Sequence, residues 1–432
     1  MSELPNPPRG MRDIVGEEAE LYEYLFEEFR NTAKSRGFKP IITPTVEYFK
    51  LFEAKSGEEI KNSMYVFEDK AGRLLALRPE VTASVVRAYI RLMRGLPKPI
   101  RLYYIAQCFR YEEPQYARYR EFWQGGLEII GDADVNADVH VAITASEFLD
   151  RIGVKHFYKV GNVLIYRAFM KRMGLSEELQ DHILHLIDKD LVERALEELR
   201  ARVGDEGVNI IEHLVGLQDL DKVSSYIEEH KGFLGELYEQ VEQEHSRMLT
   251  FIETLKELGY HAEYDPKLVR GLAYYTGLIF EYKAKHAEMT HSIGGGGRYD
   301  GLTTVYGAPF EYSTGLALGI DRIALVAKKA RVRRSTLKMG ILLLSSIPLH
   351  VGYRTLSLIP GGVEAFVYRS KSISKALEHA SKAKCDYVLI IGEKELAANA
   401  AMLKDMRTGE QRLVSFSDLA GELVRLANPQ GS

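Results

Sequence analysis

The chain has 432 residues, of which 46% are hydrophobic and 27% are charged, and its formal net charge is −4 at pH 7. This composition is typical of a folded chain of two or three domains, and it excludes disorder of the whole chain. No apolar run reaches the roughly 18 residues of a membrane span, and the polar, proline-rich residues 1–8 lack the pattern of a signal peptide. We therefore expect a cytoplasmic protein with no membrane partner.

The cysteine content argues against disulfides and zinc. Only Cys108 and Cys385 occur, far apart in the chain and without partners at the spacing of metal ligands. We expect both to be small, buried, apolar residues.

Charge is distributed unevenly along the chain. Residues 331–432 contain 15 Lys and Arg against 9 Asp and Glu, whereas residues 1–330 contain 42 against 52. A basic C-terminal part is typical of a separate nucleic-acid-binding domain, but it is equally typical of surface charge that only aids solubility. Charge alone leaves both interpretations open.

The first predicted elements are a helix and a sheet. Apolar residues recur at helical spacing between Gly16 and Gly37. Residues 38–46 are rich in β-forming residues and interrupted by prolines, and short strand-like stretches dominate residues 65–130. We expect this block to form an antiparallel sheet.

A helical stretch follows at about residues 160–258. One predicted helix is capped by Ser176 and ends near Gly204, and a second covers residues 237–259. Strand character and glycine return at residues 268–318. The helices therefore interrupt one sheet domain in the manner of an insertion.

The rest of the chain predicts a second domain. Residues 328–338 form a charged linker, and beyond it two apolar strand-like runs flank a helical pattern, which is the character of a βαβ unit. The predicted fold class is therefore α+β, with one domain at residues 1–327 and a small α/β domain at residues 339–432.

Chemistry concentrates in two strands around the polar residues 111–120. Period-two alternation puts Gln124 and Glu128 on one face of the second strand, next to Gly125 and Gly126. Strand glycines are usual at a bulge or where a ligand needs room, so this face is a candidate binding floor. The alternative is a solvated sheet face with a bulge.

Several segments together resemble the histidyl-tRNA synthetase family, a class II family of aminoacyl-tRNA synthetases. The most telling is Phe109-Arg110-Tyr111-Glu112, followed by Arg118-Tyr119-Arg120-Glu121-Phe122 and Gln124, which is similar to the family's motif 2. Any one segment would be weak, but all of them in the family's order are highly specific. The others are an opening signature at residues 7–13, the motif 1 proline at Pro44, histidine-binding segments at residues 77–82 and 296–302, a family-specific signature at residues 268–277, and motif 3 at residues 315–322.

The resemblance implies a fold, an assembly and a reaction. It implies a class II antiparallel sheet flanked by helices, a helical insertion, and a homodimer formed through the motif 1 region. The carboxylate of L-histidine would attack the α-phosphate of ATP, and the acyl group would then pass to tRNA. Both reactants are anionic, so arginines and Mg²⁺ would supply most of the stabilisation of the transition state.

The resemblance also assigns roles to four arginines. Arg110 would contact the α-phosphate and the substrate carboxylate, and Arg270 would approach the α-phosphate from the opposite side and border the histidine site. Arg322 would contact the γ-phosphate, and Arg118 would belong to the ATP site. Arg110 and Arg270 would be the catalytic residues. For any single arginine the alternative is a surface salt bridge.

Selection of histidine requires a polar group at each nitrogen of the imidazole ring. By resemblance, Glu128 and Tyr275 would contact the two ring nitrogens. The other predicted histidine-site residues hold the α-amino and carboxylate end or line the pocket: Glu80, Thr82, Gln124, Tyr274 and Tyr299. For the tyrosines the alternative is core packing with a satisfied hydroxyl.

Two departures from the family pattern stand out. Ala273 occupies a position where many members carry an aspartate, so a supporting carboxylate is missing beside the tyrosine pair. Glu113 and Tyr116-Ala117 replace basic and glycine residues that are frequent in bacterial members. The second departure favours an archaeal-like recognition of the tRNA acceptor end.

The C-terminal residues 390–411 resemble the anticodon-binding domain of several class II synthetases, and this decides the charge question in favour of tRNA binding. Two other classes of protein remain as alternatives. One is the non-catalytic, histidine-sensing regulatory subunit of ATP phosphoribosyltransferase, which would lose the ATP-facing arginines and the anticodon domain. The other is a regulatory module that binds tRNA as a signal.

Overall fold

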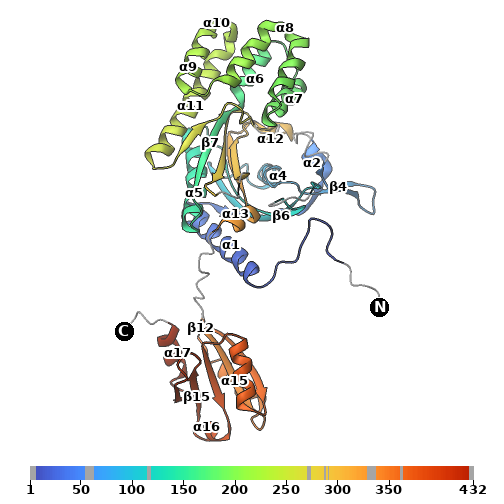
Figure 1. The fold of residues 1–432 in the computed structure, drawn as a ribbon. Coiled ribbons are helices and arrows are strands. Elements are labelled where there is room, and N and C mark those ends of the chain that lie inside the picture. The colour runs from blue at the N-terminus through green and yellow to red at the C-terminus, as the bar shows by residue number, and fades with distance from the viewer. Residues whose placement is uncertain are drawn as a thin grey trace. The chain divides into compact units, whose positions relative to one another are not determined.

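The computed structural model describes residues 6–53, 63–113, 118–269, 274–286, 289, 291–327, 337–360 and 363–427. The chain folds as two compact units, residues 1–329 and residues 330–432 (Figure 1). Within the described ranges, no helix has both the length and the apolar character needed to cross a membrane.

The first unit is built on an eight-stranded sheet with the order β1-β5-β6-β11-β10-β9-β7-β8. The pairs β1–β5 and β7–β8 are parallel and the other five are antiparallel. The predicted α+β fold class is therefore confirmed, with a mainly antiparallel sheet. In sheet order the strands are Lys39–Pro40, Ile100–Phe109, Glu121–Ile130, Ser313–Gly319, Ser292–Arg298, Leu278–Ala284, His156–Asn162 and Ala262–Tyr264.

Helices cover both faces of this sheet. Alternation along β5 shows the two sides, because Tyr103 belongs to the core formed with α1 and α5, whereas Tyr104 belongs to the core formed with α4. The predicted first helix is confirmed as α1, and Gly37 follows its end with a φ of 83°. The helices are α1 (Glu17–Ser35), α5 (Val135–Arg151) and α13 (Ile320–Val326) on one face and α4 (Thr82–Leu92) on the other.

The prediction of one antiparallel sheet for residues 65–130 is wrong in two respects. This block contains α4, whose β-branched residues imitate a strand although Val81, Val85 and Tyr89 are buried at helical spacing. Its strands also divide between two sheets, because β3 and β4 pair with β2 in a separate three-stranded sheet. These elements are β2 (Val46–Tyr48), α2 (Phe49–Glu53), β3 (Val66–Glu68) and β4 (Leu74–Leu77).

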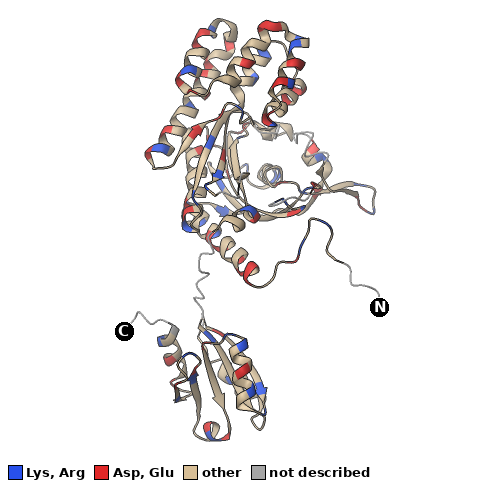
Figure 2. Ribbon diagram, in the orientation of Figure 1, with Lys and Arg blue, Asp and Glu red and all other residues tan. Residues whose placement is uncertain are grey.

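Helices occupy the chain between β7 and β8, and Figure 2 shows both signs of charge along them. The helix predicted from Ser176 to near Gly204 is two helices, because the chain turns at Asp190 with a φ of 60°. The second continues past a kink at Gly204. The elements are α6 (Val163–Arg172), α7 (Glu177–Asp188), α8 (Val192–Gly216), α9 (Leu220–Glu229), α10 (Lys231–Leu234), the 3-10 turn η1 (Gly235–Leu237) and α11 (Tyr238–Glu257).

The second unit has a five-stranded sheet with the order β13-β12-β14-β15-β16 and its own apolar core. The first three strands are parallel and the last two antiparallel. Residues 328–336 of the predicted linker lie outside the described residues. The elements are β12 (Leu337–Leu344), α14 (Leu349–Leu356), β13 (Val363–Ser370), α15 (Ile373–Lys382), β14 (Tyr387–Ile391), α16 (Glu393–Ala397), β15 (Ala400–Asp405), β16 (Gln411–Ser415) and α17 (Leu419–Ala427).

Candidate active site

A cavity of about 430 Å³ lies in the first unit, lined by residues of β6, β9, β10 and β11 together with α4 and α13. This volume is in the range of small-molecule sites, which is about 300 to 1,000 Å³. Nine of the residues predicted from the sequence line it, although they come from distant parts of the chain. They are Glu80, Thr82, Arg110, Arg118, Gln124, Tyr274, Tyr275, Tyr299 and Arg322.

Glu128 is fully buried behind two of these lining residues. Its Oε1 accepts a hydrogen bond from the Thr82 hydroxyl at 2.7 Å, and its Oε2 accepts one from the Tyr299 hydroxyl at 2.6 Å. Burial raises the pKa of the Glu128 carboxyl to about 8, and the two hydrogen bonds oppose this increase. A ligand that reached Glu128 would have to share or replace these hydrogen bonds.

Glycines on the neighbouring strands make room for this carboxyl group and for a tyrosine beside it. Gly315 pairs with Glu128 across β11 and β6, and a Cβ atom there would lie 1.7 Å from Glu128 Oε2. A Cβ atom at Gly126 would lie 2.1 Å from the ring of Tyr104. The register of β6 is continuous, so the expectation of a bulge or a ligand at Gly126 is wrong, and the space holds the buried Tyr104 side chain.

Tyrosines and a second carboxyl group complete this end of the cavity. The ring of Tyr274 lies 5.0 Å from that of Tyr275 and 6.0 Å from that of Tyr299, measured between centroids. Glu80 is also buried, and its carboxyl group accepts a hydrogen bond from the Ala83 N–H at the start of α4. Burial raises the pKa of Glu80.

Three arginines mark the other end of the cavity. Arg110 donates from Nε to the Pro79 carbonyl at 3.0 Å, Arg118 pairs with Glu112 at 2.8 Å, and Arg322 donates to the Ser292 carbonyl at 2.6 Å. Burial lowers the pKa of Arg322, and repulsion from Arg118 and Arg110 lowers it further. Cations held together against their mutual repulsion form a site whose energy improves when an anion enters.

Two residues near the N-terminus, Arg12 of the opening signature and Tyr22 of α1, contact Asp321, which precedes Arg322. Asp321 accepts hydrogen bonds from the Tyr22 hydroxyl at 2.8 Å and from the Trp123 N–H at 2.6 Å. Arg12 lies 3.5 Å from the same carboxylate and stacks over the ring of Tyr119. Arg12 of the opening segment therefore contacts both motif 2, at Tyr119, and motif 3, at Asp321.

Sequence reasoning missed several polar residues that line the cavity, among them Glu281, Lys283 and His291. Glu281 and Lys283 on β9 form an ion pair at 3.0 Å, and His291 precedes β10. Burial lowers the pKa of His291, and Arg322 and Arg118 lower it further. Period-two alternation could have identified the first two, because they lie on one face of a strand that is otherwise apolar and aromatic.

Other predicted features lie outside the described residues. Arg270 is one of them, as are Ala273 and the motif 2 loop residues Tyr116 and Ala117. Their predicted roles stay predictions. Both cysteines are buried, as expected, and among the described residues no group of three His, Cys, Asp or Glu side chains is placed to hold a metal ion.

The fold and the cavity define a class II aminoacyl-tRNA synthetase architecture. A family model described as histidyl-tRNA synthetase matches residues 10–323, and one described as an anticodon binding domain matches residues 357–426. The chain belongs to the histidyl-tRNA synthetase family.

Individual relatives agree with this assignment. A histidine–tRNA ligase of Sulfolobus acidocaldarius is 38% identical and aligns over 98% of this chain and 99% of its own. The apo histidyl-tRNA synthetase structure of S. aureus has a TM-score of 0.73 at 26% identity, covering 97% of this chain and 100% of that one. A Bacillus halodurans structure described as an ATP phosphoribosyltransferase regulatory subunit/histidyl-tRNA synthetase has a TM-score of 0.71 at 21% identity, covering 87% and 96%, and shows the shared fold.

Proposed function

We propose that this protein activates L-histidine with ATP, forming histidyl-adenylate and pyrophosphate, and transfers histidine to the 3′ end of its cognate tRNA. The observation that carries the proposal is one cavity that holds both halves of the required chemistry. Buried carboxyl and tyrosine groups lie around Glu128, and Arg110 and Arg118 lie around Arg322. The relatives that align over nearly the whole chain are histidine–tRNA ligases, which agrees with this activity.

The imidazole ring would bind at the end formed by Glu128, Tyr275 and Tyr299. A buried polar pocket of this kind rejects amino acids that cannot pair with its groups. Glu80, Thr82 and Gln124 would hold the α-amino and carboxylate end, with Tyr274 as a wall. The hydrogen bonds of Glu128 to Thr82 and Tyr299 support this proposal, because they fix the carboxyl group before a substrate arrives.

ATP would bind at the arginine end. Arg322 would contact the γ-phosphate and Arg118 the remaining phosphates, while Arg110 would bridge the α-phosphate and the histidine carboxylate. Arg270 is proposed on the sequence alone as a second cation at the α-phosphate. These groups would stabilise the charge on the pentacovalent phosphorus, which is usually the largest contribution to such a reaction.

Mg²⁺ fits this end of the cavity through its carboxylates. Glu112 and Glu281 line the cavity among the arginines, and Mg²⁺ in phosphoryl-transfer sites is usually held by one or two carboxylates together with substrate phosphates. When bound, the ion would neutralise charge on the polyphosphate. The protein side chains would still orient the two reactants.

The second unit would bind the anticodon region of tRNA. Its excess of basic residues would meet the phosphates of tRNA, which position the molecule. The proposed dimer would form through the three-stranded sheet, where Val46, Tyr48, Val66, Phe67 and Leu74 are all exposed. An apolar patch of this kind is typical of an interface. A cytoplasmic location stays a prediction.

The regulatory subunit of ATP phosphoribosyltransferase is the second candidate, because a structure with that description shares the fold. It is less supported than the synthetase. The cavity retains Arg110 and Arg322, and the chain retains a C-terminal unit that matches an anticodon binding domain. A protein that only senses histidine would need neither feature.

The test is ATP–pyrophosphate exchange with each of the twenty amino acids. We expect exchange with histidine alone, and a loss of about a hundredfold or more in Arg110→Ala and Arg322→Ala. Arg194→Ala is the matched control, because Arg194 forms an exposed ion pair with Glu198 on α8. Binding of histidine without exchange would favour the regulatory subunit, and exchange with another amino acid would contradict the roles of Glu128 and Tyr275.

A further inference from the structure

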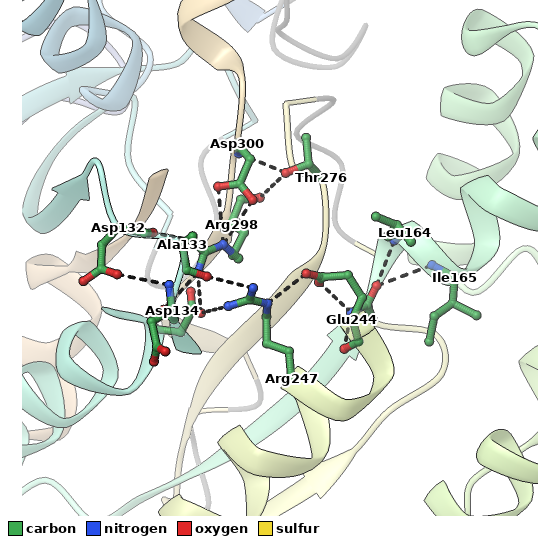
Figure 3. Close-up of polar contacts among 12 residues, drawn as sticks. Asp132, Ala133, Asp134, Leu164, Ile165, Glu244, Arg247, Thr276, Arg298 and Asp300 are labelled. Carbon is green, nitrogen blue, oxygen red and sulfur yellow. Dashed lines mark hydrogen bonds and ion pairs between the residues drawn. The ribbon is translucent and has the colours of Figure 1, made fainter. Parts of the chain in front are cut away.

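A fully buried arginine lies at the end of β10, one residue before Tyr299. Its Nε lies 3.2 Å from Asp300 Oδ2 (Figure 3). The Nη1 atom of Arg298 donates to Asp138 Oδ2 at 2.7 Å. Its Nη2 donates to the Asp132 carbonyl at 2.6 Å. Nearly all of its donors are therefore satisfied by protein, and the side chain fixes the position of the strand end.

The same network extends into the helical insertion. Asp138 Oδ2, on α5, also accepts a hydrogen bond from Arg247 Nη1 at 3.3 Å, and Arg247 Nε donates to Glu244 Oε1 at 2.8 Å. Glu244 and Arg247 both lie on α11, as Figure 3 shows. Glu244 Oε2 in turn accepts from Asn162 Nδ2 at 3.3 Å, and the Asn162 side chain caps the first turn of α6. Five charged groups and one helix cap therefore join α5, α6, α11 and β10.

The opposite side of the network holds the segments that carry the pocket tyrosines. The Thr276 N–H donates to the Arg298 carbonyl at 2.9 Å, and the Asp300 N–H donates to the Thr276 hydroxyl at 2.9 Å. Asp300 also accepts from the Ser313 N–H at 2.7 Å. Thr276 adjoins Tyr275, and both Arg298 and Asp300 adjoin Tyr299.

A glycine shows how closely α11 approaches this segment. A Cβ atom at Gly277 would lie 2.4 Å from Glu244 Oε2. The Gly277 carbonyl accepts from the Val163 N–H at 3.0 Å, at the first residue of α6. The backbone two residues beyond Tyr275 therefore lies directly between α6 and α11.

We propose that Glu244 and Arg247 are positioning residues for amino-acid recognition, which hold the segments bearing Tyr275 and Tyr299 in place from the helical insertion by way of Asp138 and Arg298. This inference rests on the proposed function, because it assigns the tyrosines to histidine binding. Neither residue reaches the cavity, so their effect passes through the backbone of residues 274–277 and 298–300.

The physical basis is the directionality of buried charge pairs. Buried arginine–carboxylate contacts tolerate few geometries, so they favour one arrangement of the elements that bear them. Removal of one member leaves its partner short of a hydrogen bond, and the neighbouring backbone adjusts to satisfy it. The affinity for histidine should therefore fall more than the affinity for ATP, because the network borders the tyrosine end of the cavity and not the arginine end.

The experiment measures ATP–pyrophosphate exchange by Glu244→Gln and Arg247→Gln in the full chain. We expect the KM for histidine to rise about two- to tenfold while the KM for ATP changes less than about twofold. The double variant is expected to be no worse than the poorer single variant, because both break one chain of contacts. Arg247→Lys, which keeps the charge, is expected to recover part of the loss. Arg298→Met is not used as a test, because it would leave the buried carboxylate of Asp138 without its main ion-pair partner.

Asp181→Asn is the matched control. Asp181 pairs with Arg167 at 2.5 Å, between α7 and α6, and both side chains are partly buried and contact no residue of β10. It is expected to lower the Tm without changing the KM for histidine. An unchanged KM for histidine in Glu244→Gln and Arg247→Gln, or a parallel rise of both KM values, would overturn the inference. The unaltered protein separates the two proposals, because a lack of histidine-dependent exchange there would refute the function itself.

Discussion

The clearest consequence of the buried Glu128 is a stability that depends on pH. Its pKa is about 8 in the folded chain and near its ordinary value of 4.5 in the unfolded chain. Below pH 4.5 both states are protonated, and between 4.5 and 8 only the folded state keeps the proton. The free energy of unfolding therefore falls as the pH rises through this window. At about 1.4 kcal/mol per pH unit, we expect a loss of about 2 to 5 kcal/mol.

Glu128→Gln isolates this effect. Glutamine resembles the protonated acid in shape and in its ability to donate and accept hydrogen bonds, so it can keep the contacts with Thr82 and Tyr299. We expect the variant to match the unaltered protein at pH 5 and to gain on it steadily up to pH 8, by several degrees in Tm. Taking the difference in Tm between the two proteins removes the contribution of every other titrating group, because both proteins contain those groups.

The assay is thermal unfolding by circular dichroism at pH values from 5 to 9, at constant ionic strength. Glu253→Gln, an exposed position on α11, serves as the control and is expected to follow the unaltered protein at every pH. Parallel Tm curves for Glu128→Gln and the unaltered protein would refute the reasoning. They would mean that Glu128 ionises in the folded chain as easily as in water.

Three further predictions concern the substrates, and the first two are measured by the KM values for histidine and ATP in pyrophosphate exchange. Gly315→Ala is expected to raise the KM for histidine at least about tenfold, because the added methyl group would displace the carboxyl group of Glu128. Gly216→Ala is the control, because a methyl group there would meet no atom within 4 Å. Equal KM values for histidine in the two variants would contradict the prediction. Arg322→Ala is expected to raise the KM for ATP more than that for histidine, and the reverse order would place it in the amino-acid site. Arg270→Ala is expected to leave the affinity for histidine, measured by calorimetry, largely intact while the rate of adenylate formation falls about a hundredfold. Equal losses in affinity and in rate would contradict a role for Arg270 in the reaction alone.

The sequence predicted well those features that depend on local pattern. Period-two alternation placed Gln124 and Glu128 on the opposite face of β6 from Leu127 and Ile129, and the core confirms this, since both apolar residues pack with α1 and α5. Apart from Gln124, the predicted cavity residues follow from motif similarity and not from local pattern, because they come from segments as far apart in the chain as Glu80 and Arg322.

Features that depend on tertiary contacts were missed. The strand-like character of residues 65–130 does not predict α4, because packing of its buried face on β5 outweighs the local propensity of its β-branched residues. The expectation of a ligand near Gly126 is wrong, because the space there accommodates Tyr104 from the adjacent strand. Asp138, which forms an ion pair with Arg298, lies 160 residues away on α5, so no local pattern predicts that ion pair.

The division of charge within the cavity explains how one site can orient two different substrates. Around Glu128 the groups that influence its pKa are Tyr299, Thr82, Tyr104 and Glu80, whereas around Arg322 they are Arg118, Glu112, Arg110 and Glu281. Arg110 is the residue common to both neighbourhoods, because it also lowers the pKa of Glu80. In the proposed function, a histidine whose ammonium group is drawn to Glu80 would direct its carboxylate toward Arg110, and a polyphosphate drawn to the three arginines would approach from the other side. The two reacting groups would therefore meet beside Arg110, where a single guanidinium can hold both.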